Sequence, residues 1–171
     1  MNITNENKIN LPDIFKEAIS IEIYGKEYYS IFSDLVDDEN ARSLFRGLAR
    51  DEGEHRELLE KEYKKLSGKT VDIKTLDKEN REKARLVFPE STDAFGISES
   101  EEVLKLGIRT EKRSIELYSN SAKRMDAGES KDLFVKLADF EEGHKKLLED
   151  ALYYFEQDGS WYGYSPPTLE G

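Results

Sequence analysis

Six side chains of metal-binding type recur in two matching sets along this chain. Each set is a single glutamate followed thirty positions later by the motif Glu-x-x-His. The sets are Glu22, Glu52 and His55, and Glu111, Glu141 and His144. Every member of the second set lies 89 positions after its counterpart in the first, and chance seldom repeats three spacings at once. The spacing therefore indicates a duplicated site.

The chemistry that these residue types favour is the binding of a pair of metal ions. Residues three apart on a helix lie about 60° apart around its axis, so each Glu-x-x-His directs a carboxylate and an imidazole to one point. Carboxylates can bridge two ions while each histidine binds one of them, which leaves open positions for oxygen or peroxide. A glutamate combined with Glu-x-x-His is the pattern of di-iron and di-manganese carboxylate bundles.

An alternative interpretation is that these residues are surface glutamates and two incidental histidines, since 37% of the chain is charged. The positions disfavour it, because all six residues fall on apolar helical stripes and the chain has no histidine outside the motifs. Burying an unpaired carboxylate costs several kcal/mol unless a cation neutralises it. We therefore expect a metal site.

Other polar residues near the motifs are expected to face solvent or to pack. Four glutamates turn away from the apolar stripes. They are Glu27, Glu54, Glu116 and Glu142. Tyr29 and Tyr118 lie on the stripes seven positions beyond Glu22 and Glu111. We favour aromatic core positions with satisfied hydroxyls for them over hydrogen bonds to the groups around the metal ligands or electron transfer.

The ring nitrogens of the two histidines that do not bind metal need acceptors of their own. Asp51 and Asp139 are close to the motifs, but they do not occupy equivalent repeat positions. The sequence assigns neither of them.

Four amphipathic helices must position the ligands. The first is expected to begin near residue 11, where Pro12 suits a first helical turn. Asp37-Asp38 then forms a turn and an N-cap for the second helix, which ends near Ser67-Gly68. The third helix carries its stripe from Val103 to Met125.

The fourth helix is expected to follow Gly128, with Ser130 as its candidate cap, and to run to about Phe155. The tail from Gly159 to Gly171 is aromatic and cannot continue a helix past Pro166. We expect it to fold back onto the helices, with packing favoured over a substrate lid or a dimer contact.

The duplicated pattern predicts an all-α, ferritin-like four-helix bundle of two pseudo-symmetric helical hairpins. In a single domain over residues 1–171, repeat one covers about 11–67, a crossover about 68–97, repeat two about 98–157 and the tail 158–171. This crossover exceeds what an adjacent antiparallel pair needs, so it should run the length of the bundle and make the second and third helices parallel. Its portion from Lys78 to Val87 looks helical.

Composition excludes several classes of protein. A chain of 171 residues with 37% hydrophobic content suits one core, and a net charge of −11 disfavours nucleic-acid and anionic-membrane partners. The lack of cysteine rules out disulfides, cysteine-type zinc sites and iron–sulfur clusters. No signal peptide or membrane span is evident, so we expect a soluble cytoplasmic protein.

The motifs LARDEGEH and LADFEEGH, together with Glu22 and Glu111, resemble the rubrerythrin family of the ferritin-like superfamily over about residues 11 to 157. Rubrerythrins bind two irons and reduce hydrogen peroxide, whereas ferritins and bacterioferritins oxidise ferrous iron. The resemblance implies that the six repeated residues are both the metal ligands and the catalytic residues of a di-iron centre. Manganese is the alternative metal, because carboxylate and imidazole ligands accept both.

Two departures from the family pattern affect the expected activity. The chain has no cysteine and so no rubredoxin domain, which implies an external electron donor such as a separate rubredoxin. Rubrerythrins also usually carry a second glutamate three residues after the ligand of the third helix, where this chain has Ser114. Six ligands, as in bacterioferritin-type sites, favour iron oxidation more than the usual rubrerythrin set does.

Three functions remain open at this stage. The leading expectation is a di-iron oxidoreductase that reduces hydrogen peroxide, or oxygen, with electrons from an external donor. The alternatives are a ferroxidase of iron-storage type, and a non-catalytic metal-binding or structural bundle. The expected partners are the electron donor, a small-molecule oxidant and a second copy of the chain in a homodimer, with no nucleic acid and no membrane.

Overall fold

Four long helices make up most of the chain that the computed structural model describes, which is residues 10–76, 78, 80, 82, 100–159 and 161. The helices are α1 (Leu11–Leu35), α2 (Glu39–Ser67), α4 (Ser100–Lys123) and α5 (Glu129–Asp158). No strand occurs within the described residues. The predicted all-α class is confirmed.

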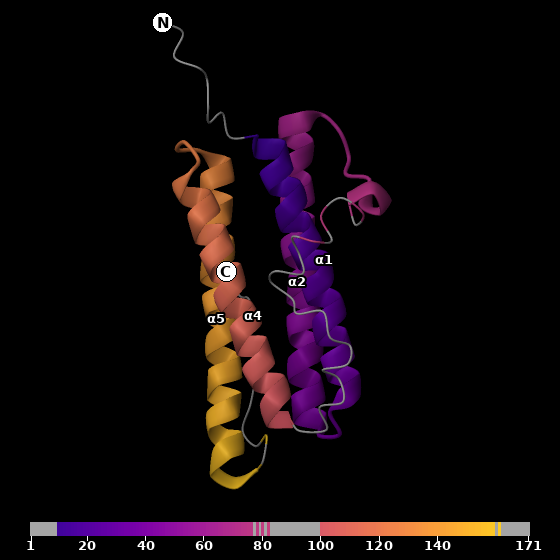
Figure 1. Ribbon diagram of the computed structural model, residues 1–171, viewed down its shortest axis with the longest axis vertical. Helices are drawn as coiled ribbons and strands as arrows, with labels where there is room; N and C mark the ends of the chain where they lie inside the picture. The colour runs from indigo at the N-terminus through magenta and orange to yellow at the C-terminus, as the bar shows by residue number, and fades with distance from the viewer. Residues whose placement is uncertain are drawn as a thin grey trace, which may run out of the picture.

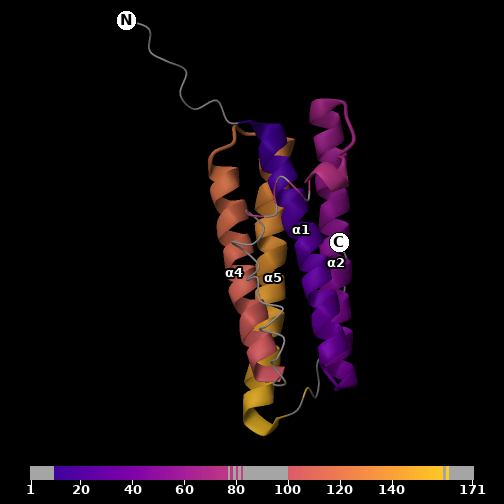
Figure 2. The same cartoon turned by 45° about the vertical axis from the view of Figure 1, so that its right-hand side comes forward.

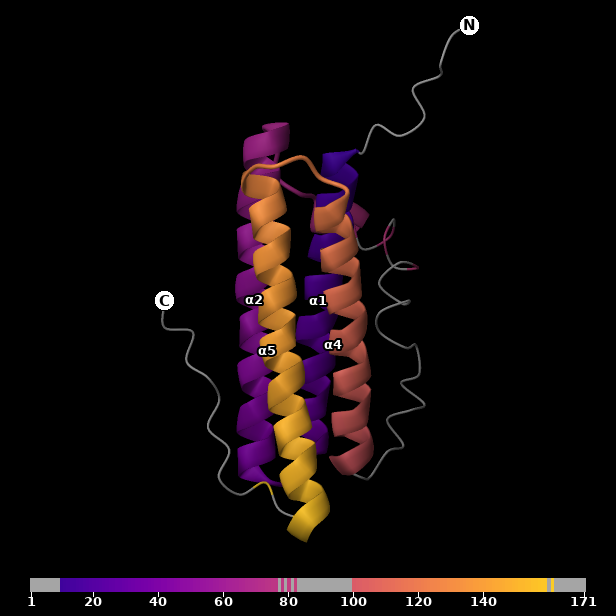
Figure 3. The ribbon, with the colours of Figure 1, turned by 90° about the vertical axis from the view of Figure 1, so that its left-hand side faces the viewer.

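The helices pair as two antiparallel hairpins. One hairpin is α1 with α2 and the other is α4 with α5, and the two lie side by side along the long axis of the bundle (Figures 1 and 2). Across the junction between hairpins, α1 faces α4 and α2 faces α5 (Figure 3). Each hairpin thus contributes one inner face to a shared core.

The direction of the helices confirms the predicted crossover. In Figure 3, α2 ends at the upper end of the bundle while α4 begins at the lower end, so the two helices run parallel. The connection between Ser67 and Ser100 therefore joins opposite ends of the bundle. Residues 73–76, 78, 80 and 82 are helical, in line with the predicted crossover helix, whose remaining residues to Val87 lie outside the described part of the chain.

The helix ends follow local capping chemistry. The side chain of Asp38 accepts hydrogen bonds from the backbone of Asn40 at 2.8 Å and Ala41 at 3.1 Å, as an N-cap does. Gly68 ends α2 with φ of 68°, a left-handed conformation that glycine adopts without strain. The predicted cap and stop of α2 are both confirmed.

The predicted cap of the fourth helix is wrong. Gly128 occupies the N-cap position of α5 without a side-chain hydrogen bond. Ser130 instead lies inside the first turn, and its hydroxyl donates to Glu62 Oε1 of α2 at 3.3 Å. The hydroxyl of Ser130 therefore makes a contact between the two hairpins, whereas the sequence predicted a hydrogen bond to the backbone of its own helix.

Aromatic rings fill the core at matching positions of the two repeats. Tyr29 and Phe45 pack with ring centroids 6.2 Å apart, and their counterparts Tyr118 and Phe134 pack at 5.8 Å. Trp161 is buried with its ring 6.1 Å from Phe45, which confirms packing for this residue of the tail. Residues 160 and 162–171 of the tail lie outside the described part of the chain.

None of the described helices is both long and apolar enough to cross a bilayer.

Candidate metal centre

All four helices contribute to one buried cluster in the middle of the bundle. The structure brings together all six residues that the repeat predicted, and each of these residues is at most 5% exposed. The residues are Glu22 of α1, Glu52 and His55 of α2, Glu111 of α4, and Glu141 and His144 of α5. Their helices present them inward because they fall on the apolar stripes.

The cluster divides into two overlapping groups of four, each with one possible ligand atom per residue and all atoms within 4.8 Å of one another. One group is Glu22, Glu52, His55 and Glu141. The other is Glu52, Glu111, Glu141 and His144. Two glutamates are therefore common to both groups, and each group adds one glutamate and one histidine of its own.

Each of the two shared glutamates directs one of its oxygens toward His55 and the other toward His144. Glu52 Oε2 lies 3.7 Å from His55 Nδ1, and Glu52 Oε1 lies 3.4 Å from His144 Nδ1. Glu141 Oε1 lies 3.4 Å from His55 Nδ1, and its Oε2 lies 3.0 Å from His144 Nδ1. Each carboxylate could therefore offer one oxygen to a cation beside either histidine, and Nδ1 is the imidazole atom that faces these oxygens.

The remaining two glutamates are held by tyrosines from the opposite hairpin. Tyr29 of α1 donates its hydroxyl to Glu111 Oε1 of α4, and Tyr118 of α4 donates to Glu22 Oε1 of α1. Both tyrosines occupy core positions with satisfied hydroxyls, as predicted, but the acceptor of each is a glutamate of the cluster, which the sequence did not assign. Each tyrosine lies seven residues, or about 10 Å, along its own helix from the glutamate of that helix. Because α1 and α4 are antiparallel, each tyrosine instead lies opposite the glutamate of the other helix.

Burial and neighbouring polar groups together shift the pKa values of the residues in the cluster. Burial and the neighbouring charge of Glu52 raise the pKa of Glu22 to about 8. Burial and the charge of Glu141 likewise raise the pKa of Glu111 well above its usual value. Burial acts to lower the pKa of His144, but its contacts with Asp51, Glu141 and Glu52 outweigh burial and hold the pKa well above the usual range.

The donor set fits two divalent cations. Four carboxylates carry four negative charges when ionised, which equals the positive charge of two such ions. Buried atoms also lack partners, since Glu22 Oε2 and His55 Nδ1 form no hydrogen bond with the described residues although they face each other at 3.5 Å. A buried polar atom without a partner is costly, and a bound cation would satisfy both.

The outward nitrogens of the two histidines have different neighbours. His144 Nε2 lies 3.5 Å from Asp51 Oδ2, whereas His55 Nε2 has no hydrogen-bond partner among the described residues. The ring of His55 stacks instead on Phe140, with centroids 4.9 Å apart. The sequence contained the signal for Asp51, because it directly precedes Glu52, but sequence alone left it unassigned. Asp139, the other candidate, is exposed.

Gly25 is a further residue of the site that the motif did not identify. A Cβ atom at this position would lie 3.2 Å from Cδ of Glu52, which is closer than side chains normally pack. The absence of a side chain on this turn of α1 thus makes room for a shared carboxylate. The four glutamates that were expected to be solvated, Glu27, Glu54, Glu116 and Glu142, are all exposed.

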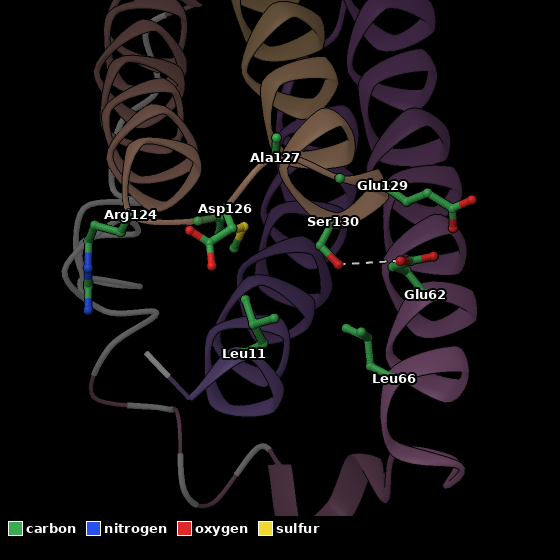
Figure 4. Close-up of a pocket in the computed structure, with 10 residues that line it drawn as sticks. Leu11, Glu62, Leu66, Arg124, Asp126, Ala127, Glu129 and Ser130 are labelled. Atoms are coloured by element: carbon green, nitrogen blue, oxygen red, sulfur yellow. Dashed lines mark hydrogen bonds between the residues drawn. The ribbon is translucent and has the colours of Figure 1, made fainter. Parts of the chain in front are cut away.

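A separate pocket of about 620 Å³ lies at the end of the bundle where α1 begins (Figure 4). Glu62, Arg124 and Ser130 are among its lining residues. Glu62 is ten residues beyond Glu52, roughly 15 Å along α2, so the pocket is distinct from the carboxylate cluster.

Comparisons with known proteins agree with this architecture. A family model described as rubrerythrin matches residues 13–153. No curated protein matches the chain. Among solved structures, a hypothetical protein from Pyrococcus furiosus superposes with a TM-score of 0.66 at 21% identity, over 94% of this chain and 97% of that chain. At this identity the superposition supports the fold alone.

Proposed function

The chain belongs to the rubrerythrin family, and we propose that its buried cluster binds two iron ions and reduces hydrogen peroxide. The observation that carries the proposal is the placement of Glu52 and Glu141, each of which faces both histidines with separate oxygens. Bridging carboxylates of this kind hold two cations close together. A single-ion site would have no need of the second set.

Each residue has a role in this proposal. Glu52 and Glu141 are the shared ligands, while Glu22 with His55 and Glu111 with His144 complete the two positions. The hydroxyls of Tyr118 and Tyr29 orient the unshared glutamates. Aromatic packing beside the tyrosines keeps water from the carboxylates, which strengthens their attraction for cations.

The reaction requires electrons that the protein side chains do not supply. Residues of the cluster would hold two ferrous ions, which would supply one electron each. Two electrons and two protons convert one hydrogen peroxide into two water molecules. A further turnover needs two electrons from outside. Because these 171 residues contain no cysteine that could hold a rubredoxin-type iron, we propose that a redox centre outside them is the donor.

The test compares oxidants on the reduced protein. Metal-free protein is loaded with Fe²⁺ without oxygen, its metal content is measured, and it is mixed with peroxide or with oxygen in a stopped-flow spectrometer. We expect two metal ions per chain and faster oxidation by peroxide. Glu52→Ala should lose peroxide turnover by at least roughly 10–100-fold, the loss that even outer partners of metal ligands cause.

Glu54→Ala is the matched control, because Glu54 lies on the same helix and is exposed. Full turnover in folded Glu52→Ala would contradict the proposal. If protein from cells grown with iron and manganese instead holds well under one metal ion per chain, that result would contradict both enzymatic functions and support a non-catalytic bundle.

Iron oxidation for storage is the second candidate function, and Ser114 is the observation that favours it. This residue is buried three positions after Glu111, where a seventh ligand would otherwise lie, and its hydroxyl is not a typical iron ligand. Faster reaction of the ferrous protein with oxygen than with peroxide would favour this candidate. Assembly of the native protein into a large cage, measured by size-exclusion chromatography, would support it further.

A further inference from the structure

The two halves of the cluster differ at one pair of equivalent positions. The repeat relates Asp51 to Phe140, since both directly precede a shared glutamate and lie 89 positions apart. Asp51 is buried and Phe140 is half-buried. The six residues of the cluster are of the same types in both repeats. The two halves therefore differ next to the cluster and not within it.

On one side, Asp51 connects a histidine to a cationic group. Its Oδ2 lies 3.5 Å from His144 Nε2, and its Oδ1 accepts hydrogen bonds from Arg50 at 3.1 and 3.3 Å. The guanidinium fixes one oxygen of the carboxylate and leaves the other directed at the imidazole. The carboxylate is thus positioned to accept the Nε2 proton of a His144 whose Nδ1 binds a metal ion.

On the other side, an aromatic ring takes that place. His55 and Phe140 stack with an interplanar angle of 7°, and the ammonium of Lys136 lies 5.3 Å from the Phe140 ring centroid. Stacking holds the plane of the imidazole but offers no acceptor for its proton. His55 Nε2 accordingly has no hydrogen-bond partner among the described residues.

We infer that the two metal positions of the cluster are unequal, and that the position at His144 fills first because Asp51 supports its histidine while Phe140 leaves His55 unsupported. This inference rests on the proposed function, since it requires that the cluster binds two ions. A carboxylate on the outer nitrogen of a histidine fixes the tautomer and raises the basicity of the nitrogen that binds metal. Loss of such a partner typically costs 10–100-fold in metal affinity.

The other contacts of the ligands do not cancel this difference. Each unshared glutamate accepts a hydrogen bond from one tyrosine hydroxyl, so the two positions are matched in this respect. The shared glutamates serve both positions. Asp51 is therefore a positioning residue that acts through His144.

The experiment titrates metal-free protein with Co²⁺ in competition with a coloured chelator. We expect two binding events per chain, separated by roughly 10–100-fold in affinity. Asp51→Asn should weaken the first event and leave the second unchanged. Phe140→Asp should strengthen the second event, since the new carboxylate would face His55 as Asp51 faces His144, and the double variant should reverse the order of filling.

Two further variants identify which position is tight. His55→Ala should retain the tight event and His144→Ala should lose it. Asp139→Asn is the matched control, because Asp139 is an exposed carboxylate beside Phe140, and it should leave both events unchanged. Circular dichroism of the metal-free variants checks folding, and Phe140→Asp keeps the test decisive if Asp51→Asn does not fold.

Two ions bound with equal affinity in the unaltered protein would overturn the inference while leaving the proposed function standing. Equal weakening of both events by Asp51→Asn would overturn it as well, because that result would mark a general structural role. Protein that binds no Co²⁺, Mn²⁺ or Fe²⁺ would overturn both the inference and the proposed function.

Discussion

The carboxyl of Glu22 couples the stability of the metal-free protein to pH. Its pKa is about 8 in the folded chain, against 4.5 for an ordinary glutamate, because of burial and the charge of Glu52. The folded state therefore keeps a proton that the unfolded chain releases between these values. The stabilising contribution is complete below pH 4.5 and is lost as the pH rises through about 8.

We expect the free energy of unfolding of the metal-free protein to fall as the pH rises over this range. The slope in Glu22→Gln should be smaller by up to roughly 1.4 kcal/mol per pH unit, the contribution of one proton. Urea unfolding at several pH values measures the slope. An identical slope in the two proteins would show that Glu22 is already ionised. Metal binding should release protons for the same reason, so metal affinity should rise with pH.

The hydroxyl of Tyr29 gives a second prediction at the scale of single residues. Tyr29→Phe removes the donor to Glu111 and keeps the ring packed on Phe45. We expect a loss of about 1–3 kcal/mol in the free energy of unfolding, because a buried carboxyl oxygen is left without its partner. Tyr118→Phe should show a similar loss by the repeat, while Tyr153→Phe, at an exposed position, should show none.

At the scale of the helices, Gly25 lowers the intrinsic stability of α1 but leaves space for the side chain of Glu52. Glycine within a helix is about 1 kcal/mol less favourable than alanine. Gly25→Ala recovers that preference but places a Cβ 3.2 Å from the side chain of Glu52. We expect the variant to weaken binding of the metal ions, since Glu52 must shift to make room.

Gly143→Ala on α5 is the matched control. Among the described residues, no atom beyond its chain neighbours and the nearby helix backbone lies within 4 Å of a Cβ at that position. The variant should therefore gain about 0.5–1 kcal/mol of stability and bind metal unchanged. Competition titration and urea unfolding measure the two quantities. Unchanged metal affinity in Gly25→Ala would show that Glu52 adapts without cost.

At the scale of the whole molecule, the cluster joins the two hairpins, and bound cations would link carboxylates from both of them. Each overlapping group draws residues from both hairpins. We therefore expect metal removal by a chelator to lower the melting temperature. Re-addition of metal at a hundredfold excess over its dissociation constant should restore about 2.7 kcal/mol. A melting temperature that is the same with and without metal would contradict a shared site between the hairpins.

Much of this arrangement could be predicted because it depends on short spacings within single helices. Glu52 and His55 share a face for any helix of ordinary pitch, and Asp38 and Gly68 act on their nearest backbone neighbours. The repeat then related each hairpin to the other. Ser130 shows the limit, because the contact with Glu62 that redirects it joins residues 68 positions apart.

The sequence by itself determined the helices, their pairing into hairpins and the six carboxyl and imidazole side chains that face the core, since periodicity and duplication are properties of the chain. Only the tertiary structure decided what stands opposite each ligand. The tyrosine hydrogen bonds span 82 and 96 positions, and the difference between Asp51 at His144 and Phe140 at His55 arises only where α2 meets α5. Spacing sets the face on which a residue lies, but the partner across the core depends on how the helices pack.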